Sequence, residues 1–190
     1  ETFLPFAFGY LVTDFDADGY LDIILYGDHI EVWRGGLNFG YVNVTLQVLP
    51  STFRGRKFSS AAQIDIDNDG DFDLYFAGGQ RLKGAGKGGP DLLLENRGGR
   101  FFDISRNANI PVVGGRTGVG VADFDNDGYL DLFLGSSIPE IPDLNATRLV
   151  DVMLRNNGNN TFSTFLNHGA MEVNRTGDVT FPAGLQILIT

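Results

Sequence analysis

The sequence of 190 residues contains no cysteine, only two histidines, and 14 basic residues against 24 acidic ones. Without cysteine the chain has no disulfide and no thiolate chemistry, and cysteine usage says nothing about its compartment. No apolar run approaches the roughly 20 residues that cross a bilayer as a helix, so we expect no membrane span. The net charge of -10 leaves no basic face, and we therefore expect no nucleic-acid partner.

The sequence also lacks the short motifs of common hydrolases. It contains no G-x-S-x-G and no H-E-x-x-H. His29 and His168 lie in unrelated contexts, and we interpret both as surface histidines. We therefore predict no catalytic residues and a protein that is not an enzyme. A catalytic site completed by residues outside this chain stays open, because nothing in the sequence tests it.

Acidic residues are abundant, and thirteen of the 24 lie in three segments, four in the first and third and five in the second. Segments 14–22, 65–73 and 123–131 share the pattern D-x-D-x-D-G-x-x-D and run directly into an apolar stretch. Carboxylates this close repel one another unless a cation lies among them. Three bound Ca²⁺ ions would change the formal charge from -10 to -4, so the acidity says little about partners.

The acidic segments have the chemistry of calcium loops. Ca²⁺ takes six to eight oxygen ligands at roughly 2.3–2.6 Å, from carboxylates and backbone carbonyls. Asp at positions 1, 3, 5 and 9 supplies side chains, position 7 supplies a carbonyl, and glycine at position 6 permits the sharp turn. The sequence predicts three Ca²⁺ sites with these ligands: Asp14, Asp16, Asp18, Tyr20 and Asp22; Asp65, Asp67, Asp69, Asp71 and Asp73; Asp123, Asp125, Asp127, Tyr129 and Asp131.

Three alternatives to calcium loops compete for this pattern. Mg²⁺ fits less well, because it demands a tighter octahedron and keeps its waters. An EF-hand needs a bidentate Glu at position 12 and flanking helices, whereas position 12 is Leu25, Phe76 or Leu134 within an apolar run. An Asx-rich turn without metal could explain one such segment, but three copies with the same oxygen positions favour an ion.

The acidic segments belong to a longer internal repeat, with spacings of 51 residues (Asp14 to Asp65) and 58 residues (Asp65 to Asp123). A strand rich in small residues precedes each segment, as expected where another backbone comes close. The apolar strand that follows should be buried on both faces, and a Gly-containing turn joins a third and a fourth strand. The first, third and fourth strands are predicted at 6–12, 30–34 and 39–44, at 59–64, 92–97 and 100–104, and at 117–122, 152–156 and 161–166.

Four short strands make one propeller blade. The sequence therefore predicts an all-β fold with three four-stranded antiparallel blades and a degenerate fourth, in a single domain 1–190. The repeats are expected at about 3–50, 51–108 and 109–166, with a degenerate tail at 167–190 that lacks the metal loop.

Segments 121–135, VADFDNDGYLDLFLG, and 152–162, VMLRNNGNNTF, together resemble the FG-GAP/VCBS repeats, the blades of integrin-α-like β-propellers. The resemblance covers about residues 3–166. It implies calcium in each acidic segment, at the ligand positions given above. It also implies an extracellular or cell-surface role in adhesion or ligand binding.

Propellers usually have four to eight blades, so three blades and a remnant predict an incomplete propeller or one completed by assembly. Open sheets expose edge strands, which natural proteins cover. We expect a protein partner or further copies of the chain to cover them, with strand 185–189 as the donor. The start at Glu1, without Met or a signal segment, suggests a processed or truncated product.

Two insertions, 79–90 and 136–148, separate the second and third predicted strands of the second and third repeats. The first insertion could be mistaken for a phosphate-binding loop. It has Arg81 where that loop needs Gly and Gly88 where it needs Ser or Thr. We expect both insertions to be surface loops on one rim, where a partner could bind.

Four N-x-[S/T] sequons, at Asn43, Asn145, Asn159 and Asn174, are candidate glycosylation sites. With the calcium loops, they favour a secreted or cell-surface glycoprotein. The leading hypothesis is a non-enzymatic, calcium-binding extracellular β-propeller module for adhesion or structural assembly. The alternative is a carbohydrate-binding, lectin-like propeller or an accessory domain of a polysaccharide-active enzyme, with a glycan as partner.

Overall fold

The computed structural model describes residues 7–51, 56–79, 89–112, 115–136 and 151–165, and two short strands at 172–173 and 179–180. Several predictions concern segments outside the described residues. These are strand 185–189 and nearly all of the tail, His168, the sequons at Asn145 and Asn174, and most of the insertions 79–90 and 136–148. No helix long and apolar enough to span a membrane occurs within the part that is described.

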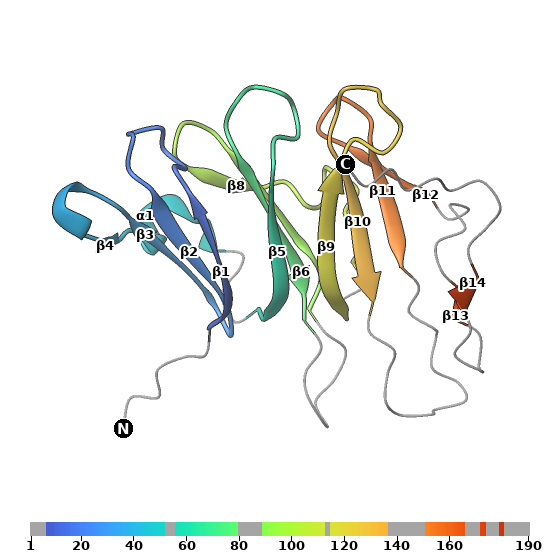
Figure 1. Cartoon of the computed structure of the whole chain (residues 1–190), viewed down its shortest axis with the longest axis horizontal. Coiled ribbons are helices and arrows are strands. Elements are labelled where there is room, and N and C mark those ends of the chain that lie inside the picture. Colours follow the sequence, from blue (N-terminus) through green and yellow to red (C-terminus); the bar gives the residue numbers. More distant parts are fainter. Residues whose placement is uncertain are drawn as a thin grey trace.

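The regular secondary structure of the described chain is almost entirely β-strand, in three four-stranded antiparallel sheets, which confirms the predicted fold class. Figure 1 shows the sheets side by side, in chain order, and we call them blades 1 to 3. Within each blade every strand pairs with the next strand in sequence. The blades comprise β1 (Ala7–Thr13), β2 (Asp22–Gly27), β3 (Ile30–Arg34) and β4 (Val42–Asn43); β5 (Phe58–Ile64), β6 (Asp73–Gly78), β7 (Leu92–Asn96) and β8 (Phe101–Asp103); β9 (Arg116–Ala122), β10 (Asp131–Ser136), β11 (Val152–Asn156) and β12 (Phe162–Phe165). A separate two-stranded ladder pairs β13 (Glu172–Val173) with β14 (Val179–Thr180).

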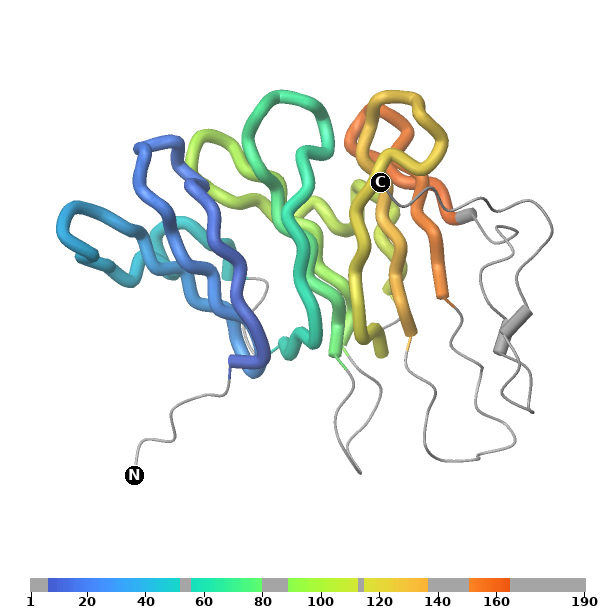
Figure 2. Tube along the Cα trace, viewed as in Figure 1, coloured from blue at the N-terminus to red at the C-terminus, as the bar shows by residue number. Residues whose placement is uncertain are grey.

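The acidic segments connect the first two strands of each blade. The pairs Thr13↔Asp22, Ile64↔Asp73 and Ala122↔Asp131 close the ladder, and the segment between them forms a loop. We call segments 14–22, 65–73 and 123–131 loops 1, 2 and 3, so that position 9 of each loop is also the first residue of the second strand. Figure 2 shows that all three loops lie at the same end of the blades.

Two apolar cores lie between the blades in the described part of the chain. The first core packs Ile24 and Val32 of blade 1 against Leu74 and Phe76 of blade 2. The second core packs the opposite face of blade 2, including Tyr75, against blade 3. Full burial of one such side chain contributes about 1.5–3 kcal/mol, so these interfaces supply much of the stability.

The strand after each loop was expected to be buried on both faces. In β6 all six residues are buried, as predicted, because blade 2 has a neighbour on each side. In β2 and β10 only three of the six residues are buried, since the described structure places a blade against one face of each.

The first repeat departs from the prediction at its fourth strand. Strand β4 covers only Val42–Asn43 instead of 39–44, and the 3₁₀ helix η1 (Leu37–Phe39) precedes it. Gly35 does not form the predicted tight turn, because its role is close packing. A Cβ there would lie 2.2 Å from the carbonyl oxygen of Leu21. A short helix that the sequence did not predict, α1 (Thr45–Val48), follows β4 and buries Val48 in the first core.

Candidate metal centres

Each loop gathers carboxylates into one cluster. In every loop, three aspartates place one oxygen each so that the three oxygens lie within 4.8 Å of one another. The clusters are Asp14, Asp16 and Asp18 in loop 1; Asp65, Asp67 and Asp73 in loop 2; and Asp123, Asp125 and Asp127 in loop 3. A set of hard oxygen donors at this spacing matches the ligand chemistry of a divalent cation such as Ca²⁺.

The aspartate at position 1 folds the loop around itself. In loop 1, Asp14 Oδ1 accepts a hydrogen bond from Asp18 N at 3.0 Å, and Oδ2 accepts one from Gly19 N at 2.9 Å. Asp65 and Asp123 accept the corresponding pairs of hydrogen bonds in loops 2 and 3. These bonds fold the backbone of each loop around the carboxylate at position 1.

Two loop positions adopt left-handed backbone conformations. The glycines at position 6 have φ values of 87°, 93° and 90°, as their freedom from a Cβ allows. Position 4 has φ near 58° as well, and holds Asn68 and Asn126 in loops 2 and 3 but Ala17 in loop 1. Asparagine tolerates this conformation better than alanine. The asparagine repeated at position 4 of loops 2 and 3 could have predicted this left-handed conformation from the sequence.

The residues at position 7, expected to supply a carbonyl ligand, close the loop through their amides. The N–H groups of Tyr20, Asp71 and Tyr129 donate to the position-5 carboxylates Asp18, Asp69 and Asp127, at 2.9, 2.8 and 3.0 Å. Asp69 thus lies in its loop, although the tightest cluster of loop 2 contains Asp73 in its place.

The aspartate at position 9 is buried and braces two backbone segments. Asp22 Oδ2 accepts a hydrogen bond from Phe15 N at 2.9 Å, and Oδ1 accepts one from Gly35 N at 2.8 Å. Asp73 and Asp131 repeat this arrangement. Burial raises the pKa of all three carboxyls, and that of Asp73 reaches about 7. Ionising a carboxyl group at these buried positions costs free energy, and a nearby cation would offset that cost.

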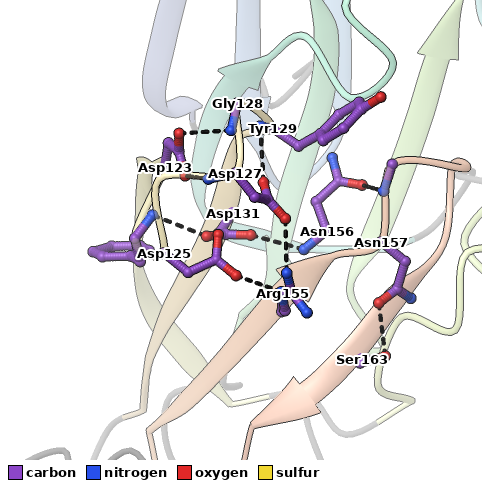
Figure 3. Close-up of polar contacts among 12 residues, drawn as sticks. Asp123, Asp125, Asp127, Gly128, Tyr129, Asp131, Arg155, Asn156, Asn157 and Ser163 are labelled. Carbon is purple, nitrogen blue, oxygen red and sulfur yellow. Dashed lines mark hydrogen bonds and ion pairs between the residues drawn. The ribbon is translucent and has the colours of Figure 1, made fainter.

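Arginines from the third strand reach the carboxylates of two loops. In blade 1, Arg34 Nε lies 2.6 Å from Asp16 Oδ2. In blade 3, Arg155 lies 2.5 Å from Asp125 and 2.9 Å from Asp127, as Figure 3 shows. Blade 2 has Glu95 at the same strand position, paired with Arg97 at 2.6 Å. The guanidinium groups partly neutralise loops 1 and 3, a contribution that the sequence reasoning missed.

One atom of loop 1 tests directly whether the residues fit an ion. Asp16 Oδ1 is buried and accepts no hydrogen bond within the structure. A buried carboxylate oxygen without a donor is costly unless a cation contacts it. Its position beside Asp14 and Asp18 therefore fits a divalent ion bound in this loop.

Loops 1 and 2 lie against the following blade, and loop 3 is more open. A Cβ on Gly99 of blade 2 would lie 2.7 Å from the Cβ of Asp16. Asn160 of blade 3 donates to Asp67 at 3.3 Å. The Asp16 side chain is 14% exposed, whereas that of Asp125 is 38% exposed.

A buried polar cluster away from the loops was not predicted. Asp91, at the start of β7, accepts hydrogen bonds from Tyr75 Oη at 2.8 Å and Gly78 N at 2.7 Å, and Arg116 of blade 3 lies 3.7 Å away. Burial raises the pKa of Asp91 to about 6 and also raises that of Tyr75. The cluster joins blades 2 and 3. Its aspartate recurs in blade 3, where Asp151 directly precedes β11 and accepts a hydrogen bond from Ser136 N at 2.7 Å. This repeated aspartate was a signal in the sequence that the loop pattern did not include.

Other predicted residues lie away from the loops. His29 is half-buried and pairs with Glu31 at 2.8 Å. Among the described sequons, Asn43 and Asn159 are exposed. Asn159 Oδ1 accepts a hydrogen bond from Thr161 Oγ1 of its own sequon at 2.6 Å.

Comparison with known sequences bears on the repeats directly. The family described as FG-GAP-like repeat matches residues 14–76 and 65–134, which together span more than half of the chain. The two matches overlap, and between them they include loops 1, 2 and 3. Comparison with curated proteins gives no match. The chain therefore belongs to the FG-GAP-like repeat family, and its three sheets are β-propeller-like blades.

Proposed function

We propose that this chain is a calcium-stabilised β-propeller module in which loops 1, 2 and 3 each hold one Ca²⁺. The observation that carries the proposal is the gathering of three carboxylate oxygens within 4.8 Å in every loop. The orphaned oxygen of Asp16 supports it, because a cation would satisfy that atom. The ligands would be those expected from the sequence, with the position-9 aspartates contacting the ion and the backbone together.

Calcium in this site would act on the fold, because each loop joins the first two strands of its blade. For Kd values of about 10⁻⁴–10⁻³ M, as in extracellular calcium modules, millimolar Ca²⁺ contributes about 0.4–1.4 kcal/mol per site. Three sites would contribute about 1–4 kcal/mol, a sizeable part of a typical unfolding free energy of about 5–15 kcal/mol.

We further propose a non-enzymatic role in adhesion or structural assembly outside the cell. Millimolar calcium is available there, and the exposed sequons at Asn43 and Asn159 are accessible to glycosylation. The loop carboxylates, taken up by the ion and by backbone amides, would not be free for acid–base catalysis. The partner would be another protein or further copies of the chain that cover the sheet edges.

Calorimetric titration of the calcium-free protein with CaCl₂ tests the calcium role. We expect three ions per chain, and two ions per chain when Asp14→Asn, Asp16→Asn and Asp18→Asn are combined in loop 1. Thermal melts should give a higher Tm in calcium than in EDTA, by about 2–4 °C for each kcal/mol of bound-ion stabilisation. Titration heats at the level of buffer dilution and identical melts would contradict the proposal.

A carbohydrate-binding role is the second candidate, and the outer face of blade 1 favours it. Phe8 and Tyr10 on β1 are 60% and 68% exposed. On the same face, Trp33 and Tyr41 line an open groove of about 320 Å³. Aromatic rings on an open face can stack on the apolar face of a sugar ring. Tyr10→Ala should abolish binding to a glycan panel, whereas Phe72→Ala on blade 2 should not. Equal binding by both variants and the wild type would contradict this role.

A further inference from the structure

The second residue of loops 1 and 2 is held by two blades at once. In loop 1, Phe15 N donates to Asp22 of its own blade at 2.9 Å, and Phe15 O accepts from Asn96 Nδ2 of blade 2 at 2.8 Å. In loop 2, Ile66 N donates to Asp73 at 2.9 Å, and Ile66 O accepts from Asn156 Nδ2 of blade 3 at 2.8 Å. The peptide groups next to the first proposed calcium ligands are therefore fixed from both sides.

Each of these amides also serves the loop of its own blade. Asn96 Nδ2 donates to Phe72 O of loop 2 at 3.3 Å, and Asn156 Nδ2 donates to Leu130 O of loop 3 at 3.2 Å. One side-chain NH₂ group thus bonds two consecutive loops, one carbonyl in each. The backbone amides of Asn96 and Asn156 also donate to Asp73 and Asp131, at 2.7 and 2.8 Å. Figure 3 shows Asn156 beside Asp131 in blade 3.

The two asparagines are rigidly placed. Asn96 is 1% exposed and Asn156 is fully buried. Their Oδ1 atoms accept hydrogen bonds from Gly99 N at 2.9 Å and Gly158 N at 3.0 Å. With donors and acceptor all engaged, neither side chain can rotate without breaking several bonds. A displacement of one loop is therefore transmitted to the next.

Blade 1 shows what happens to this position without a preceding loop in the described structure. Gly35 replaces the asparagine, and its N–H still donates to Asp22 Oδ1 at 2.8 Å. The brace within the blade is kept, while the side chain that would bridge two loops is missing. In blades 2 and 3, which follow a described loop, an asparagine at this position bridges two loops.

We propose that Asn96 and Asn156 couple consecutive calcium loops, so that occupation of one loop raises the calcium affinity of the next. This inference rests on the calcium role proposed above. An ion that fixes the carboxylates of one loop would also fix its bridged carbonyl, and through the shared amide it would order the neighbouring loop before its ion binds. Asn96 and Asn156 are positioning residues, because they contact the loop backbone and not the ion.

Calcium titration of the full chain, analysed for its Hill coefficient, tests the coupling. We expect the wild type to bind three ions with a Hill coefficient above one, later ions binding about 5-fold or more tightly than the first. The double variant Asn96→Asp with Asn156→Asp removes both amide donors at nearly constant shape. It should still bind three ions, with a Hill coefficient below that of the wild type, although the hydrogen bond from Asn68 Nδ2 to Gly128 O at 3.0 Å still joins loops 2 and 3. The matched control Asn157→Asp makes the same change at an exposed neighbour and should leave cooperativity unchanged.

A second pair, Asn96→Ser with Asn156→Ser, serves if the aspartate variant does not fold. It adds no charge and leaves a single donor, which cannot serve two loops, so the Hill coefficient should again fall below that of the wild type. A folded variant with the same Hill coefficient as the wild type would overturn the coupling through Asn96 and Asn156. Three independent ions in the wild type would also overturn it while leaving the calcium role intact. A wild type that binds no calcium would instead refute the calcium role.

Discussion

The contact between loop 1 and the β7–β8 turn of blade 2 can be tested with one methyl group. Gly99 has φ +84°, and a Cβ there would lie 2.7 Å from Asp16 Cβ and 3.4 Å from Asp16 Cα. Gly98, the preceding residue, has φ +60° with nothing within 4 Å of a Cβ. Alanine at either position adopts a left-handed conformation, but only Gly99→Ala also meets a neighbour.

The expected loss of unfolding free energy in each variant follows from the left-handed backbone conformation and, for Gly99→Ala, from the close contact. Left-handed backbone costs an L-residue about 1 kcal/mol, so Gly98→Ala should destabilise the protein by about that amount. Carbon atoms in contact lie about 3.5–4.0 Å apart, so Gly99→Ala also requires a shift of roughly 1 Å in a packed loop. Overpacking of this kind costs about 1–3 kcal/mol. The total for Gly99→Ala is therefore about 2–4 kcal/mol.

Equilibrium urea denaturation in EDTA measures both variants without a contribution from the ion. With a slope of about 2 kcal/mol per M, the midpoint of Gly99→Ala should lie about 0.5–1.5 M below that of Gly98→Ala. In calcium the difference should increase, because the displaced Asp16 is a proposed ligand. Equal midpoints for the two variants in EDTA would refute the packing of blade 2 on loop 1.

Three further predictions concern single residues. The pKa of Asp91 is raised from 3.8 to about 6, so the stability contribution of its protonated form is complete below about pH 4 and is lost as the pH rises through 6. Wild type should therefore lose about 3 kcal/mol relative to Asp91→Asn between pH 4 and 7 in paired urea titrations; parallel curves would contradict this. Ala17→Asn should raise the unfolding free energy by about 0.5–1 kcal/mol, since Ala17 has φ +56°; a lower Tm would count against the assigned loop conformation. Arg155→Met removes the cation beside Asp125 and Asp127, so calcium should bind loop 3 more tightly, while the stability of the calcium-free protein changes little because the ion pair is exposed; weaker calcium binding in a titration would show that Arg155 assists the ion.

The strands of this fold could be predicted from the sequence because the repeat supplies three aligned copies of one pattern. The third strand was expected at 30–34 and 152–156 and is found at those residues in blades 1 and 3. The fourth strand of blade 1 was predicted to be longer than it is, because Gly35 was interpreted as part of a tight turn. In the structure Gly35 instead allows the backbone to approach Leu21 closely. A glycine required by packing and one required by a turn look the same in a single sequence.

The candidate sites were predictable where the pattern is local, and not where it depends on distant contacts. Four aspartates within nine residues predict a loop from the local sequence alone. The hydrogen bond from Asn96 to Phe15, by contrast, joins residues that lie 81 positions apart in the sequence. The arginine contacts were also hidden, since Glu95 interrupts the pattern set by Arg34 and Arg155. Such contacts depend on how one blade packs on the next, and this packing could not be predicted from the sequence of a single chain.

The calcium account is tested most directly by anomalous X-ray diffraction from crystals grown in calcium. The account predicts three anomalous peaks per chain, each among the carboxylates at positions 1, 3, 5 and 9 of one loop, with about 2.3–2.6 Å between ion and oxygen. Well-ordered loops without a peak, under calcium concentrations in the millimolar range, would contradict it.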